Sequence, residues 1–82
     1  MQSNNKVCVY ALKSKKDGSL YIGISKDPDI RLQEHNKRKT SSNRSRAPFE
    51  MIFREKYGSY TEARKQEKYW KSGIGREQLR QL

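Results

Sequence analysis

The stretch VCVYALKSKKDGSLYIGI, residues 7–24, decides the fold. Its two ends, Val7–Leu12 and Leu20–Ile24, are apolar runs rich in β-branched and aromatic side chains, a composition typical of strands. Between them, Asp17-Gly18 is a strong hairpin-turn signal, because glycine adopts a positive φ without steric cost. The stretch therefore predicts two antiparallel strands joined by a turn.

The residues after this hairpin predict a helix, a third strand and two further helices. Asp27-Pro28 marks a helix start, because an aspartate side chain caps the free amides of the first turn and proline suits the first helical position. Ser59 followed by Glu62 is a capping-box signal for a later helix. The expected elements are a helix from Pro28 to about Arg38, a strand over Phe49–Tyr57, a helix after Ser59 to about Lys71, and a short helix from Arg76.

Length and element order indicate one small α+β domain. With 82 residues and no internal repeat, the chain has room for a single domain, residues 1–82, with a modest core. The order β-β-α-β-α-α predicts a small three-stranded antiparallel sheet flanked by helices. The polar, basic segment from Lys39 to Arg46 is interpreted as an exposed, mobile loop.

The charge of the chain indicates an anionic partner. Lys and Arg total 19 against 9 Asp and Glu, a formal net charge of +10, and the pI is near 10.0. An excess of this size most often serves the phosphate backbone of a nucleic acid. An anionic membrane surface is the competing interpretation. It is weaker, because no predicted helix is basic on one side and broadly apolar on the other.

Cysteine content and hydropathy exclude several classes of protein. Cys8 is the only cysteine, which excludes an internal disulfide and a cysteine-rich zinc site; its apolar surroundings favour a small buried hydrophobe. The N-terminus is polar, and no apolar stretch approaches the roughly 20 residues needed to span a bilayer. We therefore expect a soluble, cytoplasmic protein with no membrane partner.

Two tyrosines on the predicted hairpin are candidates for chemistry. Tyr10 and Tyr21 lie on adjacent strands, one on either side of the turn. A cross-strand aromatic pair explains them structurally. Alternatively, their hydroxyls hold or activate a water molecule, which for a phenol of pKa near 10 requires nearby positive charge or metal.

Three further side chains have both a structural and a functional interpretation. Arg31 is either one solvated cation among many or a clamp for a phosphate. His35, the only histidine, lies four residues further along the same helix face and is either a partly exposed polar residue or a proton-transfer group. Glu67 is either an ion-pair partner within its helix or a ligand for Mg²⁺, which takes one or two protein carboxylates.

The ordered set of these residues resembles the GIY-YIG nuclease superfamily over nearly the whole chain. The second family tripeptide is present unaltered as Tyr21-Ile22-Gly23, and the first appears as Cys8-Val9-Tyr10, which keeps the tyrosine. The segment DPDIRLQEHN, residues 27–36, resembles the helix with the family arginine and histidine; EARKQEKYWK, residues 62–71, resembles the helix with the metal-binding glutamate. The likeness is greatest to small stand-alone bacterial members, related to the N-terminal nuclease domain of the excision-repair incision enzyme.

This resemblance implies a metal-dependent endonuclease that hydrolyses phosphodiester bonds and leaves a 5′-phosphate and a 3′-hydroxyl, with its active site on the sheet surface. By the same resemblance, Glu67 would hold one Mg²⁺ or Mn²⁺ ion, and Arg31 would stabilise the charge of the transition state. Tyr10 or Tyr21 would orient or deprotonate the attacking water, with His35 assisting. No small-molecule cofactor is implied.

The chain also departs from the family pattern. Many relatives have a lysine just after the second tripeptide, where this chain has Ile24; Lys26 is the candidate substitute. Glu62 is the alternative metal ligand, although a capping role already explains it. The expected nucleic-acid contacts are Lys26, Lys37, Arg38, Lys39, Arg44 and Arg46. DNA is favoured over RNA by family analogy, and phosphate contacts of this kind carry little sequence information.

Two other functions compete with a nuclease. The first is a nucleic-acid-binding module with a nuclease-like fold that does not cut; retention of all five candidate groups argues against it. The second is an accessory protein whose basic surface docks an acidic protein. Salt-sensitive binding to nucleic acid is expected of a nuclease and of a binding module, but not of an accessory protein. A binding measurement therefore tests the accessory-protein interpretation.

Overall fold

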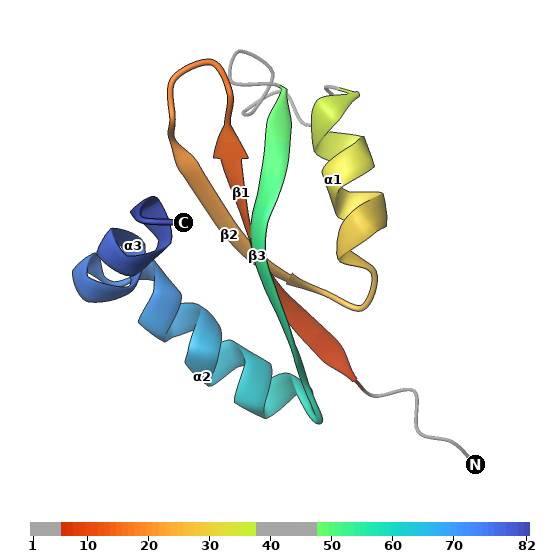
Figure 1. Ribbon diagram of the computed structural model, residues 1–82. Coiled ribbons are helices and arrows are strands. Elements are labelled where there is room, and N and C mark those ends of the chain that lie inside the picture. The colour runs from red at the N-terminus through yellow and green to blue at the C-terminus, as the bar shows by residue number, and fades with distance from the viewer. Residues whose placement is uncertain (1–5, 38–47) are drawn as a thin grey trace.

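An antiparallel sheet forms the middle layer of the protein, with helix α1 on one side and helices α2 and α3 on the other, as the computed structural model shows (Figure 1). The structure describes residues 6–37 and 48–82. The strand order in the three-stranded sheet is β2-β1-β3, and the predicted order β-β-α-β-α-α is confirmed. The elements are β1 (Val7–Ser14), β2 (Leu20–Ser25), α1 (Pro28–Asn36), β3 (Phe49–Tyr57), α2 (Tyr60–Lys71) and α3 (Gly73–Arg80).

The predicted hairpin is present, and β1 continues two residues beyond its predicted end. Gly18 adopts a φ of 78°, the positive value that the turn requires. Its amide donates to the Ser14 carbonyl at 2.9 Å, and the Ser14 amide donates to the Ser19 carbonyl at 2.8 Å. This closure sets the register of the hairpin, in which Tyr10 lies opposite Gly23.

The central strand β1 is buried on both faces, because each face is covered by helices. Residues of one parity, Val7, Val9 and Ala11, pack with β2, α2 and α3 residues. Residues of the other parity, Tyr10 and Leu12, pack on the α1 side. Each large side chain buried in this way stabilises the fold by about 1.5–3 kcal/mol. The remaining members of the two clusters include Ile22, Ala63 and Leu79 on the first face and Phe49, Leu32 and Met51 on the second.

A bulge in β3 turns two adjacent side chains toward the α2 side of the sheet. Ala11 pairs with Phe53 and the next residue, Leu12, pairs with Met51, so Ile52 is the additional residue. Ile52 and Phe53 therefore both pack on the α2 side of the sheet, although adjacent strand residues ordinarily alternate. The Phe53 ring lies 4.7 Å from that of Trp70 on α2, measured between centroids.

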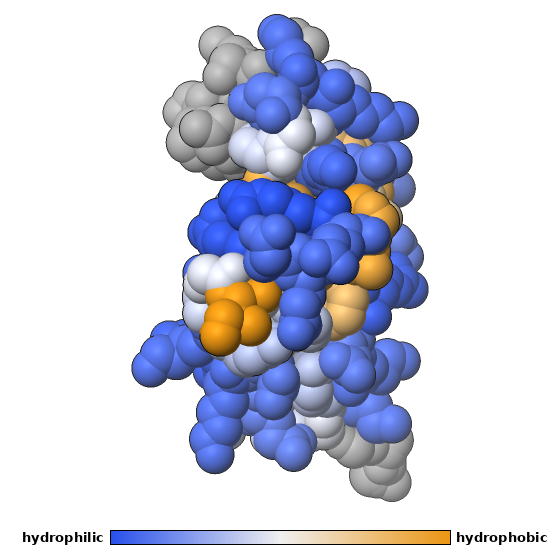
Figure 2. All heavy atoms as spheres, turned by 60° about the vertical axis from the view of Figure 1, so that its left-hand side comes forward, coloured by the Kyte–Doolittle hydropathy of each residue, from blue (hydrophilic) through white to orange (hydrophobic). Residues whose placement is uncertain are grey.

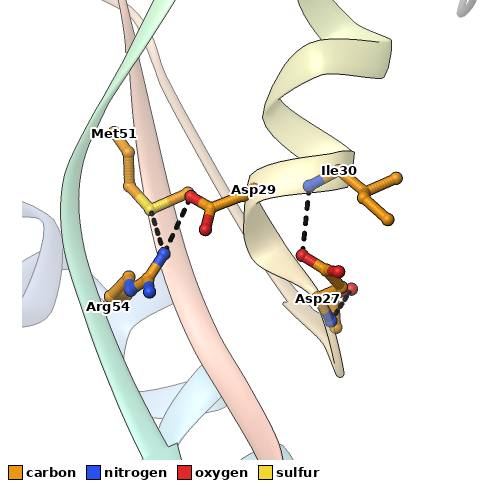
Figure 3. Close-up of polar contacts among 6 residues, drawn as sticks. Asp27, Asp29, Ile30, Met51 and Arg54 are labelled. Carbon is orange, nitrogen blue, oxygen red and sulfur yellow. Dashed lines mark hydrogen bonds and ion pairs between the residues drawn. The ribbon is translucent and has the colours of Figure 1, made fainter.

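Polar contacts at both ends attach α1 to the rest of the fold. Asp27 Oδ1 accepts from the Ile30 amide at 3.3 Å, as the capping prediction requires, and Arg54 of β3 donates to Asp29 at 2.9 Å (Figure 3). This exposed ion pair contributes at most about 1 kcal/mol.

The stronger attachment lies at the other end of the helix. The Asn36 side chain donates to the Phe49 carbonyl at 3.1 Å and accepts from the Phe49 amide at 2.6 Å. It thereby satisfies the backbone of a buried residue at the start of β3.

The turn between α2 and α3 differs from the sequence prediction. Helix α3 begins at Gly73, three residues before the predicted start at Arg76. Ser72 ends α2 and also begins α3: its hydroxyl donates to the Tyr69 carbonyl at 2.5 Å and accepts from the Gly75 amide at 3.3 Å. Because one serine satisfies both helix ends, the chain turns without a left-handed residue.

Most of the surface on the α2 and α3 side is hydrophilic, with small, separate hydrophobic patches (Figure 2). Within residues 6–37 and 48–82, none of the helices combines the length and the apolar character needed to cross a membrane.

Candidate active site

A cleft of about 430 Å³ follows the edge strand β2. Side chains reach it from both faces of the sheet: Arg31 from the α1 side, and Glu67 from the α2 side. The cleft thus crosses the edge of the sheet, whereas the family resemblance implied a site on the sheet surface. Its lining residues are Tyr10, Leu20, Tyr21, Ile22, Gly23, Ile24, Arg31, Glu67, Lys71 and Arg76.

The two tyrosines form a diagonal pair across the hairpin. Tyr10 lies opposite Gly23 and Tyr21 lies opposite Leu12, so both rings are on the α1 face. Their centroids are 6.3 Å apart with an interplanar angle of 33°. A Cβ added at Gly23 would lie 2.8 Å from the Tyr10 hydroxyl oxygen and 3.2 Å from Tyr21 Cε1. The glycine therefore provides the space in which the Tyr10 ring crosses β2.

The two hydroxyl groups differ in their environment. Tyr10 is 1% exposed, whereas Tyr21 is 37% exposed. Burial, reinforced by Tyr21, raises the pKa of Tyr10 to about 12, although Arg31 opposes the shift. Tyr10 therefore stays protonated at neutral pH and can donate a hydrogen bond, and Tyr21 is the more exposed of the two tyrosines.

His35 lies behind Tyr21 and is not among the residues that line the cleft. It is buried, with its ring centroid 4.5 Å from that of Tyr21 and 5.8 Å from that of Phe49. Burial, followed by the Arg31 charge, lowers the pKa of His35 below its usual 6.5. A neutral imidazole packed in this way supports the Tyr21 ring.

Arg31 reaches the cleft from the exposed side of α1. Its side chain is half-exposed, and Nη1 lies 3.2 Å from Glu34 Oε1 in an ion pair one turn along the helix. The remaining guanidinium donors can contact an anion, because an arginine has five N–H groups. The structure is therefore compatible with both interpretations of Arg31, and its role as a phosphate clamp stays a prediction.

Glu67 lies on the stripe of α2 that faces the sheet, in line with Ala63 and Trp70, which pack against the core. Its side chain is 16% exposed, a low value for a carboxylate. Lys71 Nζ lies 3.0 Å from Oε2 and Arg64 Nε lies 3.9 Å from Oε1. The structural interpretation of Glu67 as an ion-pair partner is thus confirmed, and its position in the cleft also leaves the metal-binding interpretation open to test.

The donor set fits a hard divalent cation that keeps most of its water. In the part of the chain that the structure describes, no three His, Cys, Asp or Glu side chains gather closely enough to hold a metal among themselves. Zinc sites usually need three or four such ligands, whereas Mg²⁺ commonly binds through one or two carboxylates and several waters. Glu67 supplies one carboxylate in the cleft, and Glu62, the alternative ligand, does not line it.

The structure describes two of the six residues predicted to contact nucleic acid. Lys26 and Lys37 are exposed and outside the cleft lining. Arg38, Lys39, Arg44 and Arg46 lie outside the described residues, as does the loop predicted from Lys39 to Arg46.

The sequence reasoning missed two cations that line the cleft, Lys71 and Arg76. Lys71 had a signal, since it follows Glu67 by four residues. Arg76 had none, because the turn at Ser72 brings it to the cleft.

Comparison with known proteins identifies the family to which this fold and this set of residues belong. A model of the GIY-YIG catalytic domain matches residues 6–79. The UPF0213 protein SERP0126 of Staphylococcus epidermidis is 35% identical over 75 residues, 90% of each chain. The UPF0213 protein SA0446 of Staphylococcus aureus is 34% identical over 73 residues, 88% of each chain.

The fold has a counterpart among solved structures. The solution NMR structure of the UPF0213 protein BH0048 from Bacillus halodurans matches with a TM-score of 0.55 and 35% identity, over 90% of this chain and 81% of that one. The fold, the hairpin tyrosines and the family match together define a nuclease-type catalytic domain. The chain belongs to the GIY-YIG family. Within it, the relatives named above are UPF0213 proteins.

Proposed function

We propose that the protein is a divalent-metal-dependent endonuclease that hydrolyses phosphodiester bonds in nucleic acid, with DNA as the favoured substrate. One observation carries the proposal: a single cleft gathers Tyr10, Tyr21, Arg31 and Glu67 from four separate elements. Structural needs alone account for each residue separately, but not for their meeting in one cavity. We further propose that residues 1–82 act as one domain, in the cytoplasm, without reading the base sequence.

The residues of the cleft divide the reaction among them. Arg31 holds the scissile phosphate and offsets the charge that grows on its oxygens in the transition state. Tyr21, the exposed tyrosine, accepts a hydrogen bond from the attacking water and orients it, and the proton of that water passes to solvent as its oxygen bonds to phosphorus. Tyr10 stays protonated and donates a hydrogen bond that orients the water or the phosphate. His35 acts through Tyr21, whose ring it supports.

The products follow from which bond to phosphorus breaks. The water oxygen forms a bond to phosphorus while the bond from phosphorus to the 3′ oxygen breaks, which leaves a 5′-phosphate and a 3′-hydroxyl. The 3′ oxygen takes up a proton from solvent. A divalent ion held by Glu67, Mg²⁺ or Mn²⁺, would supply positive charge at a non-bridging phosphate oxygen.

Cleavage of labelled DNA tests the proposal. Single-stranded, duplex and branched DNA and an RNA strand are incubated with Mg²⁺ or Mn²⁺, with EDTA in parallel. Glu67→Gln keeps the size of the side chain but removes its charge, and we expect it to lower the rate at least about 100-fold. Glu62→Gln is the matched control, because Glu62 is on the same helix but does not line the cleft. It should cut like the wild type.

Two results would contradict the proposal. The first is equal cleavage by wild type and a folded Glu67→Gln variant, which would point to a contaminating nuclease. The second is salt-sensitive binding of DNA with no cleavage under any condition, which would favour the binding module instead.

A further inference from the structure

Arg76 is held at the cleft by the tight corner between α2 and α3. Ser72 bonds to both helices, and a Cβ added at Gly75 would lie 2.2 Å from the Tyr69 carbonyl oxygen and 2.6 Å from Trp70 Cα. Only glycine allows the two helices to approach so closely. The residue that follows this glycine is Arg76, which lines the cleft. The corner therefore fixes where that side chain begins.

The guanidinium itself is also oriented. Arg76 Nε donates to the Lys71 carbonyl at 3.1 Å, a bond from the side chain of α3 to the end of α2. Arg76 is half-buried, and this bond restricts the orientation of its side chain. A guanidinium held through Nε presents its two terminal amino groups in a fixed direction, the geometry in which arginine binds a phosphate with two parallel hydrogen bonds.

Arg76 differs from the other two cations that line the cleft in its ion pairing. Arg31 is paired with Glu34, and Lys71 is paired with Glu67. Among residues 6–37 and 48–82, no carboxylate lies within ion-pair distance of Arg76. A half-buried cation that lacks an internal counter-ion in this part of the chain is best stabilised by an anion from outside.

We propose that Arg76 binds a phosphodiester group of the substrate, one that neighbours the scissile phosphate. The inference rests on the proposed function and adds a second phosphate site to it. Arg31 lies on α1 and Arg76 lies on α3, and these two helices cover opposite faces of the sheet (Figure 1). A nucleic-acid strand that contacts both residues therefore crosses the edge of β2, and its backbone is held at the scissile phosphate and at one neighbouring phosphate.

Equilibrium binding tests the site without any need for cleavage. A fluorescein-labelled single-stranded DNA is titrated with protein in EDTA, and its anisotropy is followed from 50 to 300 mM KCl. We expect Arg76→Ala to weaken binding about tenfold at low salt, the usual effect of losing a charged hydrogen-bonding pair. The slope of log affinity against log salt should become shallower by about 0.7, the value for one phosphate contact on a single strand.

Two further variants separate charge, geometry and folding. Arg76→Lys keeps the charge but loses the bond to the Lys71 carbonyl, so it should keep the salt slope and recover only part of the affinity. Arg80→Ala is the matched control: Arg80 lies on the same helix, is exposed, pairs with Glu77 at 3.6 Å and does not line the cleft. It should bind within twofold of wild type. Thermal melting of each variant checks that the corner is intact.

The outcomes distinguish this inference from the proposed function. If Arg76→Ala weakens binding and flattens the salt slope while wild type never cuts, the phosphate site stands and the nuclease proposal fails. If wild type cuts and Arg76→Ala raises KM with little change in kcat, both stand. If Arg76→Ala behaves like Arg80→Ala, or if the wild type binds no DNA, the inference is wrong.

Discussion

Replacing Gly23 by alanine tests how the hairpin arranges its two tyrosines. The added Cβ would lie 2.8 Å from the Tyr10 hydroxyl oxygen and 3.0 Å from Tyr10 Cζ. Non-bonded carbon atoms prefer separations of about 3.5–4.0 Å, so the ring must retreat by roughly 0.5–1 Å. Tyr10 is 1% exposed, so packed neighbours restrict the movement of its ring. We expect Gly23→Ala to lower the free energy of unfolding by about 1–3 kcal/mol, the usual cost of overpacking.

The same displacement should lower activity more than stability alone explains. A shift of about 1 Å in a catalytic group can reduce the rate about 100-fold. Urea unfolding followed by circular dichroism gives the stability, and cleavage at temperatures where the variant is folded gives kcat and KM. Gly58→Ala is the control: its Cβ would meet only Glu62 Oε1, at an ordinary 3.6 Å. It should match the wild type in both measurements.

A double variant identifies the contact responsible. Tyr10→Phe removes the hydroxyl that makes the shortest contact with the added Cβ. In the Gly23→Ala background it should therefore cost less stability than in the wild type, with a coupling of at least about 0.5 kcal/mol. Additive effects, or a Gly23→Ala protein with wild-type stability and kcat, would refute the claim that this glycine makes room for Tyr10.

Three further predictions concern other parts of the fold. Because the pKa of His35 is lowered by folding, the unfolded chain binds more protons between that lowered pKa and about 6.5. Stability should thus be full above about pH 6.5 and fall as the pH drops through that window; urea midpoints should show the fall, and His35→Gln should lack it. Asn36→Ala should destabilise the protein by about 1–3 kcal/mol in the same urea assay, because it removes two hydrogen bonds to the backbone of buried Phe49; an unchanged midpoint would contradict that estimate. Gly75→Ala should lower the melting temperature markedly, since its Cβ meets backbone atoms of α2, whereas Gly73→Ala, with open space around it, should be neutral or raise it slightly.

The sequence predicted the order and type of every element, because the signals for them are local. Strand periodicity, the Asp17-Gly18 turn and the caps at Asp27 and Ser59 each act within a few residues. The start of α3 was predicted wrongly for a related reason. Glycines at its first turn have low helix propensity, and the serine that caps both helices was not recognised.

The site was predictable only in part. Tyr10, Tyr21, Arg31 and Glu67 were chosen through the family resemblance, and the fold brings all four into one cleft. Arg76 could not be chosen, because its position depends on a close contact between two helices that no local pattern describes. The burial of His35 likewise depends on residues from two strands.

The cleft draws its lining from the first strand and from the last helix, residues 10 to 76. A chain still being synthesised, with only its N-terminal half outside the ribosome, has Tyr10 and Arg31 but lacks Glu67. A fragment released by proteolysis after α1 has the same deficit. Neither can assemble the full set of groups, so the proposed cutting activity is latent until the whole domain has folded.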